Sequence, residues 1–397
     1  MATQPLQLLD SATLDGRLAR LYDIMNRQGV KALLVSDNAN KFYLTGRIFD
    51  GYIYVNEPDR QVSYFVRRPA ELTGQHVHQI RKPELIPETM DHAGLRRVEP
   101  LGLEQDESTY ATVMRLANAM GVDTFVNADS VLMQARAVKD DAELKMISQC
   151  GVKHTRIYKR VPHAFQEGMS DVELQIEIER LSRLEGSIGI MRVSGGDMEI
   201  NMGSVLVGHN ADTPSPYDFA LGGAGTSPAL PVGADGTIIS PGNTVMVDTN
   251  GDFNGYMTDM TRTFTYGDIP DDVRDAHQLS VNICHAIAKA GIPGVQCADL
   301  YLLAEGMVRQ AKLEEAFMGH RSHAGFVGHG VGITVNELPV LSPKSKDVLQ
   351  VGNVIALEPK FVFPKVGAVG IENTYVVTPD GMKCLTGAPE ELVALDH

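Results

Sequence analysis

The sequence has no tryptophan, few cysteines and no long apolar run, and each scarcity narrows the class of protein. Its 397 residues include 4 cysteines, which lie far apart and match neither a zinc motif nor a disulfide framework. No stretch approaches the ~20 apolar residues needed to cross a bilayer, and no basic leader with an apolar core opens the chain. We therefore expect a cytoplasmic protein that neither spans nor coats a membrane.

Basic residues are also in the minority, with 35 Lys and Arg against 50 Asp and Glu and a formal net charge of −15. This surplus repels nucleic-acid phosphate and anionic lipid, so we expect neither as a partner. Hydrophobic residues make up 43% of the chain, enough at this length for the cores of two or three domains. Whether some acids surround a metal ion depends on their positions.

The first third alternates between helical and strand patterns. Apolar residues recur at helical spacing before Gly29 and again over residues 109–121, and short apolar runs at 31–37 and 61–69 are typical of strands. We expect a mixed α/β domain over residues 1–137.

The pattern changes near residue 137, where a long polar helix begins, and we place a second domain at 138–397. Ser170 and Glu173 have the spacing of a capping box that opens another helix. Residues 222–236 contain five glycines and two prolines, which predicts a loop. Because helices stand among strands in the rest of this half, we expect an α+β fold.

Two aspartates lie in a pattern typical of a β-hairpin. Asp248 ends an apolar run, a Gly/Asn turn follows, and Asp259 lies in a second run. An unpaired carboxylate leaving a buried strand costs several kcal/mol unless a cation or hydrogen bonds satisfy it. Either residue alone can equally be a turn aspartate that caps its own hairpin.

Three more candidate ligands follow. His329 lies between glycines, and Glu358 and Glu372 lie in strongly apolar β runs, where glutamate is uncommon. The two glutamates call for a shared positive partner. That partner is either a metal ion or a structural ion pair with Lys360 or Lys365, and the sequence leaves both open.

The order Asp, Asp, His, Glu, Glu resembles the pita-bread metallopeptidase family, which includes methionine aminopeptidase, aminopeptidase P, prolidase and the non-peptidase creatinase. The match is strongest over about residues 140–385. Residues 38–47, NANKFYLTGR, resemble the creatinase-type N-terminal domain that precedes the catalytic domain in prolidase and aminopeptidase P. The resemblance implies a pita-bread catalytic domain after a smaller creatinase-type domain.

The resemblance also implies a dinuclear metal site. Asp248 would bind one metal, Asp259 and Glu372 would bridge both, and His329 and Glu358 would complete the second. Two divalent ions per chain are expected. Ligand type alone does not choose among Mn²⁺, Co²⁺, Fe²⁺ and Zn²⁺. The family resemblance favours Mn²⁺ or Co²⁺. A metal-bridging hydroxide would attack the scissile carbonyl, with Glu358 as general base.

Two histidines that usually accompany the metals in these peptidases are missing. One position holds Asn336, and the other holds Val232 or Ser215, depending on the alignment. His323 and His209 lie near the right motifs. We take Asn336, His323 and His209 as candidate substrate-binding residues, against the alternative that both histidines are ordinary surface groups.

Arg262 follows Asp259 by three positions and resembles a recurrent arginine of the family motif. A regular strand would point it to the opposite face from Asp259. It would then form a surface or interface salt bridge, whereas an irregular strand would let it contact a ligand carboxylate.

The expected function is a dinuclear metal-dependent exopeptidase that acts on small peptides and cleaves next to proline, as an Xaa-Pro dipeptidase or aminopeptidase. The alternative is a creatinase-like but metal-using hydrolase or lyase with a small non-peptide substrate. A non-catalytic binding protein is the third possibility, but such relatives typically lose the metal ligands. Prolidase-like relatives are commonly homodimers, so a dimer is expected by resemblance.

Overall fold

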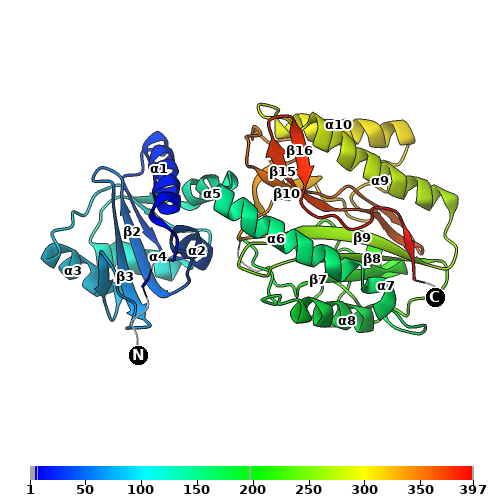
Figure 1. Cartoon of the computed structure of the whole chain (residues 1–397), viewed down its shortest axis with the longest axis horizontal. Helices are drawn as coiled ribbons and strands as arrows, with labels where there is room; N and C mark the ends of the chain where they lie inside the picture. Colours follow the sequence, from blue (N-terminus) through cyan, green and yellow to red (C-terminus); the bar gives the residue numbers. More distant parts are fainter. Residues whose placement is uncertain (1–4, 7, 196–197, 396–397) are drawn as a thin grey trace. The chain divides into compact units, whose positions relative to one another are not determined.

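The computed structural model describes residues 5–6, 8–195 and 198–395. The chain divides into two compact units, Met1–Arg136 and Ala137–His397 (Figure 1). Both units combine helices with β-sheet, which confirms the predicted fold class. No helix among the described residues has the length and apolar character needed to cross a membrane.

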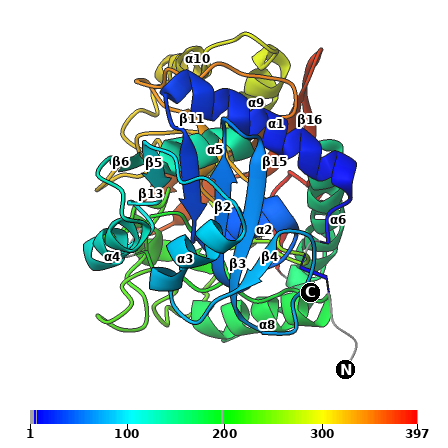
Figure 2. The same ribbon diagram turned by 90° about the vertical axis from the view of Figure 1, so that its left-hand side faces the viewer.

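The first unit is built on a mixed sheet of strand order β4-β3-β2-β1-β5-β6, and Figure 2 looks onto this unit. Strands β1, β2 and β3 pair antiparallel, and β5 and β6 join in parallel. Residues of the sheet and of two of its helices form one apolar core. The elements are α1 (Ser11–Gln28), β1 (Ala32–Val35), α2 (Asn38–Thr45), β2 (Asp50–Asn56), β3 (Gln61–Arg68), β4 (Val77–Gln79), η1 (Pro83–Leu85), α3 (Ile86–His92), β5 (Leu101–Leu103), α4 (Tyr110–Met120), β6 (Phe125–Asn127) and α5 (Asp129–Ala137).

Local sequence signals account for both ends of α1. Asp10 caps α1 by accepting a hydrogen bond from the Thr13 amide, and Gly29 ends it in the left-handed conformation that glycine adopts without strain. The helix, and the strand that follows it, lie where the apolar periodicity predicts them.

The second unit carries the predicted ligands and contains three groups of strands between helices (Figure 1). A four-stranded sheet has the order β17-β9-β8-β7, a five-stranded sheet has the order β11-β10-β12-β15-β16, and β13 pairs with β14. The strands are β7 (Gly203–Val207), β8 (Asn243–Asn250), β9 (Asp259–Tyr266), β10 (Gly328–Gly330), β11 (Glu337–Leu341), β12 (Val354–Leu357), β13 (Lys360–Phe363), β14 (Gly367–Gly370), β15 (Asn373–Thr378), β16 (Gly381–Cys384) and β17 (Val393–Ala394).

Helices cover these strands on two sides. One apolar core joins α6, α7 and α8 to β7, β8 and β9, and another joins α9 and α10 to β12, β13, β14 and β15. The capping box of Ser170 and Glu173 opens α8 as predicted. The helices are α6 (Asp141–Tyr158), α7 (Val161–Ala164), α8 (Asp171–Leu184), η2 (Gly208–Asp212), α9 (Asp271–Ala290) and α10 (Cys297–Ala311).

Candidate metal centre

The two aspartates lie on adjacent antiparallel strands, as the hairpin pattern predicts. Asp248 of β8 pairs with Thr261 of β9, and Asn250 pairs with Asp259. Because side chains alternate along a strand, Asp248, Asp259 and Thr261 share one face of the sheet. Val247, the residue before Asp248, faces the other way and packs in the core that includes α6 and α8.

The other three predicted ligands lie on three adjacent inner strands of the five-stranded sheet or directly beside their ends. His329 lies in β10, Glu358 directly follows β12, and Glu372 directly precedes β15. Pairing of β12 with both neighbours brings these positions together. The sequence segments are far apart, so the sheet alone creates this cluster.

The imidazole of His329 faces the carboxylates. Its Nδ1 lies 3.1 Å from the Gly330 carbonyl, to which it can donate a hydrogen bond, and this orients Nε2 toward the acids. Nε2 lies 3.2 Å from Glu358 Oε1 and 3.9 Å from both Asp259 Oδ2 and Glu372 Oε1. One ligand atom from each of Asp259, His329 and Glu372 lies within 4.8 Å of the others.

Glu372 shows that this space suits a cation. Its side chain is 1% exposed, yet among the described residues no donor hydrogen-bonds to its Oε1 atom. A buried carboxylate oxygen without a hydrogen-bond donor is costly, and a cation beside it would offset that cost. Asp259, His329 and Glu372 could therefore hold a metal ion, with Glu358 beside them.

Lys360 is also part of this cluster. Its ammonium lies 2.8 Å from Asp248 Oδ2, 2.7 Å from Glu358 Oε2 and 3.2 Å from Glu372 Oε2, and the side chain is fully buried. The ion pair that the sequence leaves open is thus present through Lys360. Lys365 lies in the exposed turn between β13 and β14.

The pKa values of the metal-free cluster follow from burial and charge. Burial, followed by the charge of Asp248, raises the pKa of Asp259 to about 7. Burial would also raise the pKa of Glu358, but Lys360 and His329 outweigh it and lower the pKa to about 2. Burial disfavours the charge of Lys360, yet its carboxylate neighbours outweigh that effect and raise its pKa well above the usual value.

His329 follows the same logic with the opposite sign of charge. Burial favours neutral imidazole and would lower its pKa. The hydrogen bond and charge of Glu358, with the charges of Asp259 and Glu372, outweigh burial and raise the pKa of His329 to about 10. Without a metal, His329 is therefore protonated at neutral pH.

Within the described part of the chain, the three candidate substrate-binding residues make their hydrogen bonds and ion pairs with groups other than the predicted metal ligands, and their role in binding substrate stays a prediction. Asn336 accepts from the Ser194 amide at 2.7 Å and donates to the Ser194 carbonyl at 2.8 Å, so its amide holds a neighbouring segment. His209 is 69% exposed and lies 3.7 Å from Asp235. His323 has its Nδ1 2.8 Å from the Phe317 carbonyl and lines a pocket.

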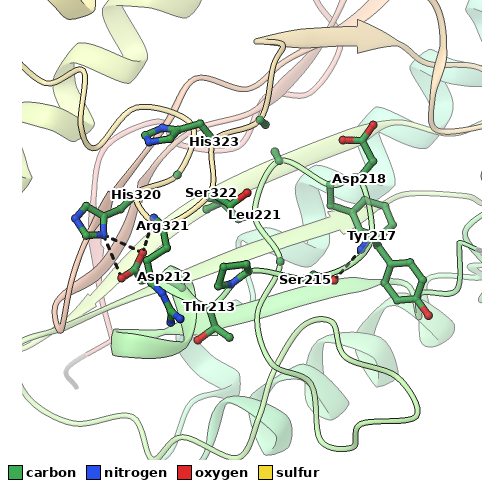
Figure 3. A pocket seen from close by; sticks show the side chains of 17 residues that line it. Asp212, Thr213, Ser215, Tyr217, Asp218, Leu221, His320, Arg321, Ser322 and His323 are labelled. Atoms are coloured by element: carbon green, nitrogen blue, oxygen red, sulfur yellow. Dashed lines mark hydrogen bonds and ion pairs between the residues drawn. The ribbon is translucent and has the colours of Figure 1, made fainter.

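This pocket is lined by residues 211–215, 217–222 and 319–324 (Figure 3). Among the residues that line it, Asp212 accepts hydrogen bonds from the His320 ring and from the Arg321 amide. No sequence motif singles out Asp212 or His320, because only the fold brings these distant positions together.

Two residues of the pocket pack against strands that carry members of the cluster. Val362 lies two residues after Lys360, and Met246 two residues before Asp248, so each pair shares a strand face. Val362 and Met246 pack in one apolar cluster with the pocket residues Ala211 and Leu221.

Both alternative positions for the missing histidine are held within the protein. Ser215 donates through Oγ to the Pro231 carbonyl, and Val232 is buried in the same glycine-rich segment. Residues 222–236 contain no helix or named strand among the described residues, as predicted.

Arg262 is buried, so the surface salt bridge considered from the sequence is wrong. It donates to the main-chain carbonyls of Thr261 and Glu372 and to the side chain of Asn373. It also donates to the carbonyls of Pro389 and Ala388. Arg262 thus supports the main chain of a predicted ligand rather than its carboxylate.

Fold and cluster together define a pita-bread protein with a carboxylate–histidine cation site. The family model of metallopeptidase family M24 matches residues 145–379, and the creatinase/prolidase N-terminal domain matches residues 17–138. The chain therefore belongs to metallopeptidase family M24, which confirms the predicted family and class of enzyme.

Relatives match over nearly the whole chain. The putative dipeptidase YkvY of Bacillus subtilis is 28% identical, covering 96% of this chain and 99% of its own length. The Xaa-Pro dipeptidase of Pyrococcus horikoshii is 24% identical, over 95% and 98% respectively.

Solved structures share the fold. The prolidase of Pyrococcus horikoshii OT3 matches with a TM-score of 0.77 at 22% identity, covering 95% of this chain and 100% of that one. The Xaa-Pro dipeptidase of Bacillus anthracis gives a TM-score of 0.79 at 20% identity, over 96% and 99%.

Proposed function

We propose that the chain is a metal-dependent exopeptidase that hydrolyses a peptide bond next to proline, as an Xaa-Pro dipeptidase or aminopeptidase. The observation that carries this proposal is the meeting of Asp259, His329 and Glu372 around a buried oxygen of Glu372 to which no donor among the described residues hydrogen-bonds. The names of full-length relatives support the choice of proline-containing peptides.

Asp259, His329 and Glu372 would hold a divalent ion, with Mn²⁺ or Co²⁺ favoured and Fe²⁺ or Zn²⁺ as alternatives. When bound, such an ion would polarise the scissile carbonyl and lower the pKa of water. The sequence-based expectation of a second ion assigns Asp248 to it. That assignment requires Asp248 to exchange its present partner, Lys360, for a metal.

Glu358 is the proposed proton acceptor. Its two oxygens face different cations, with His329 beside Oε1 and Lys360 beside Oε2. These contacts hold the carboxylate in one orientation beside the predicted metal ligands. There it can take a proton from water and return it to the leaving amine. Glu358 would thus be both an ion neighbour and the general base.

The pocket beside Asp212 and His323 is the proposed binding region for part of the substrate. Its residues Ala211 and Leu221 pack against the strands that carry Asp248 and Lys360. Its histidine, arginine and aspartate side chains offer partners for the charged ends of a small peptide. The homodimer and the cytoplasmic location stay predictions.

The second candidate is a metal-using hydrolase or lyase with a small non-peptide substrate. The observation that favours it is the engagement of Asn336 with Ser194 on both sides of its amide. One of the two N–H donors of Asn336 is then used within the protein, which leaves only the other to replace the missing histidine as a donor to a peptide carbonyl. Losing one donor of this kind typically costs about 3–4 kcal/mol of transition-state stabilisation.

A substrate panel distinguishes the two candidates. Purified chain with added Mn²⁺ is assayed on Xaa-Pro dipeptides, on Xaa-Pro-Yaa tripeptides and on matched peptides with alanine in place of proline. Turnover of dipeptides alone indicates a dipeptidase, and turnover of tripeptides at their first bond indicates an aminopeptidase. Metal-loaded protein that cleaves none of them contradicts the peptidase and favours the second candidate.

A further inference from the structure

The ammonium of Lys360 lies among three of the four carboxylates that the family resemblance gives to two metal ions. It is 2.8 Å from Asp248, 2.7 Å from Glu358 and 3.2 Å from Glu372. We infer that Lys360 replaces one of the two ions, so that the chain binds a single divalent ion, beside Asp259, His329 and Glu372. This inference rests on the metal site of the proposed function.

The hydrogen bonds of the Lys360 ammonium are those of a group that stays permanently among the carboxylates. A lysine ammonium has three N–H donors, and each meets a different carboxylate oxygen. The side chain is fully buried, and an ammonium in such a place needs this pairing to offset its lost hydration. An incoming ion on that side would have to bind the same oxygens and displace a fully paired cation.

The two carboxylate oxygens of Glu372 face different cations, one the ammonium of Lys360 and the other the proposed metal ion. Its Oε2 accepts from Lys360 and, at 2.8 Å, from the Thr261 hydroxyl. Its Oε1 points to the side of His329 and is the oxygen without a hydrogen-bond donor. Glu372 would therefore bridge one ammonium and one metal ion, where the sequence-based expectation had it bridge two metals.

The charge of the cluster also favours one ion. The four carboxylates and Lys360 together carry −3 when ionised, so one divalent ion with neutral His329 leaves −1. A second divalent ion would bring the buried cluster to +1 and place three cations close together. Like charges a few ångströms apart repel by several kcal/mol in a site of low dielectric.

Metal counting tests the inference without an activity assay. Metal-free protein is loaded with excess Mn²⁺, passed through a desalting column, and analysed by native mass spectrometry and by elemental analysis. We expect one ion per chain for the wild type and two for Lys360→Ala, which frees Asp248 and opens the space. The control is Lys365→Gln, which removes a lysine from the exposed end of the same hairpin and should leave one ion.

Each outcome separates this inference from the proposed function. Two ions in the wild type overturn the inference and leave the peptidase proposal standing. One ion in both the wild type and Lys360→Ala also overturns it, because Lys360 would then not be what excludes the second ion. No ion in the wild type contradicts the metal requirement of the proposed function itself.

A second measurement needs no variant, in case Lys360→Ala does not fold. The electron paramagnetic resonance spectrum of the Mn²⁺-loaded wild type distinguishes an isolated ion from two ions coupled through shared carboxylates. We expect the spectrum of an isolated ion at every Mn²⁺ concentration. A spin-coupled spectrum would overturn the inference.

Discussion

Arg262 donates a hydrogen bond of 2.8 Å from Nη1 to the main-chain carbonyl of Glu372. The same guanidinium donates to Asn373 and to two carbonyls near the C-terminal end of the described chain, at Ala388 and Pro389. Burial makes these bonds consequential, because carbonyls that lose a buried donor lose their hydration as well. Arg262 thus fixes the start of β15, from which Glu372 reaches the cluster.

We expect Arg262→Met to lower the free energy of unfolding by about 3 kcal/mol or more, since several buried acceptors lose their donor together. Urea denaturation of the metal-free protein measures this change. The control is Arg309→Met, because Arg309 is largely exposed on α10 and pairs with Glu305 of the same helix. An equal loss in the two variants would contradict the role of Arg262.

Asp259→Ala should empty the metal site. Asp259 provides one of the three atoms that meet around the unpartnered oxygen of Glu372. Loss of an outer-shell partner alone typically lowers metal affinity or activity 10–100-fold, so loss of this ligand should lower both by more than about 100-fold. Equilibrium dialysis with Mn²⁺ measures the affinity, with the fully exposed Asp268→Ala as the control. A variant that still binds Mn²⁺ as the wild type does would exclude Asp259 as a ligand.

His154 should make stability depend on pH. Its ring nitrogens contact Thr258 and Thr249, and burial lowers its pKa to about 3 from the usual 6.5. Between these values the unfolded chain takes up a proton that the folded chain does not. Stability is therefore retained above pH 6.5 and falls below it, by at most about 1.4 kcal/mol per pH unit.

The measurement compares the wild type with His154→Gln by urea denaturation from pH 7 to pH 5. Other groups also titrate in this interval, Asp259 among them, but they are common to both proteins, so the difference between the two isolates the contribution of His154. The wild type should lose stability relative to the variant as the pH falls. A constant difference across the interval would show that His154 is not the group responsible.

Asn210 should control the glycine-rich segment 222–236. It is fully buried, donates to the Gly233 carbonyl at 2.9 Å and accepts from the Ala224 amide at 2.8 Å. Asn210→Ala removes both bonds, so the segment should be cut faster by a nonspecific protease. If the segment forms part of the substrate rim, KM should rise several-fold with little change in kcat. The exposed Asn118→Ala is the control, and an unchanged KM would remove the segment from the rim.

Much of the fold was predictable because local patterns determine it. The capping box before α8, the glycine that ends α1 and the hairpin of Asp248 and Asp259 each depend on a few neighbouring residues. The roles of the five candidate ligands are implied by the resemblance of their order and surrounding motifs to the pita-bread family, and these roles stay predictions.

Other parts depend on contacts between distant segments. Asn336 meets Ser194 only because two loops adjoin, so the sequence could not show that its amide is engaged. The strand alternation correctly placed Arg262 opposite the aspartates, but its burial depends on residues 388–390, which return to cover it. The sequence offers both Lys360 and Lys365 as partners for an ion pair. The path of β13 decides between them, because Lys360 is buried beside the carboxylates and Lys365 lies in the exposed turn.

The buried ammonium of Lys360 has a consequence for how the centre responds to its surroundings. A cation that belongs to the polypeptide cannot be removed by a chelator or exchanged for a competing metal, and its supply does not vary with growth conditions. Part of the carboxylate cluster stays neutralised even when no metal is available, so the empty centre is protected from the mutual repulsion of its acids. One positive charge of the site is thus a covalent part of the chain and is present whether or not a metal ion is bound.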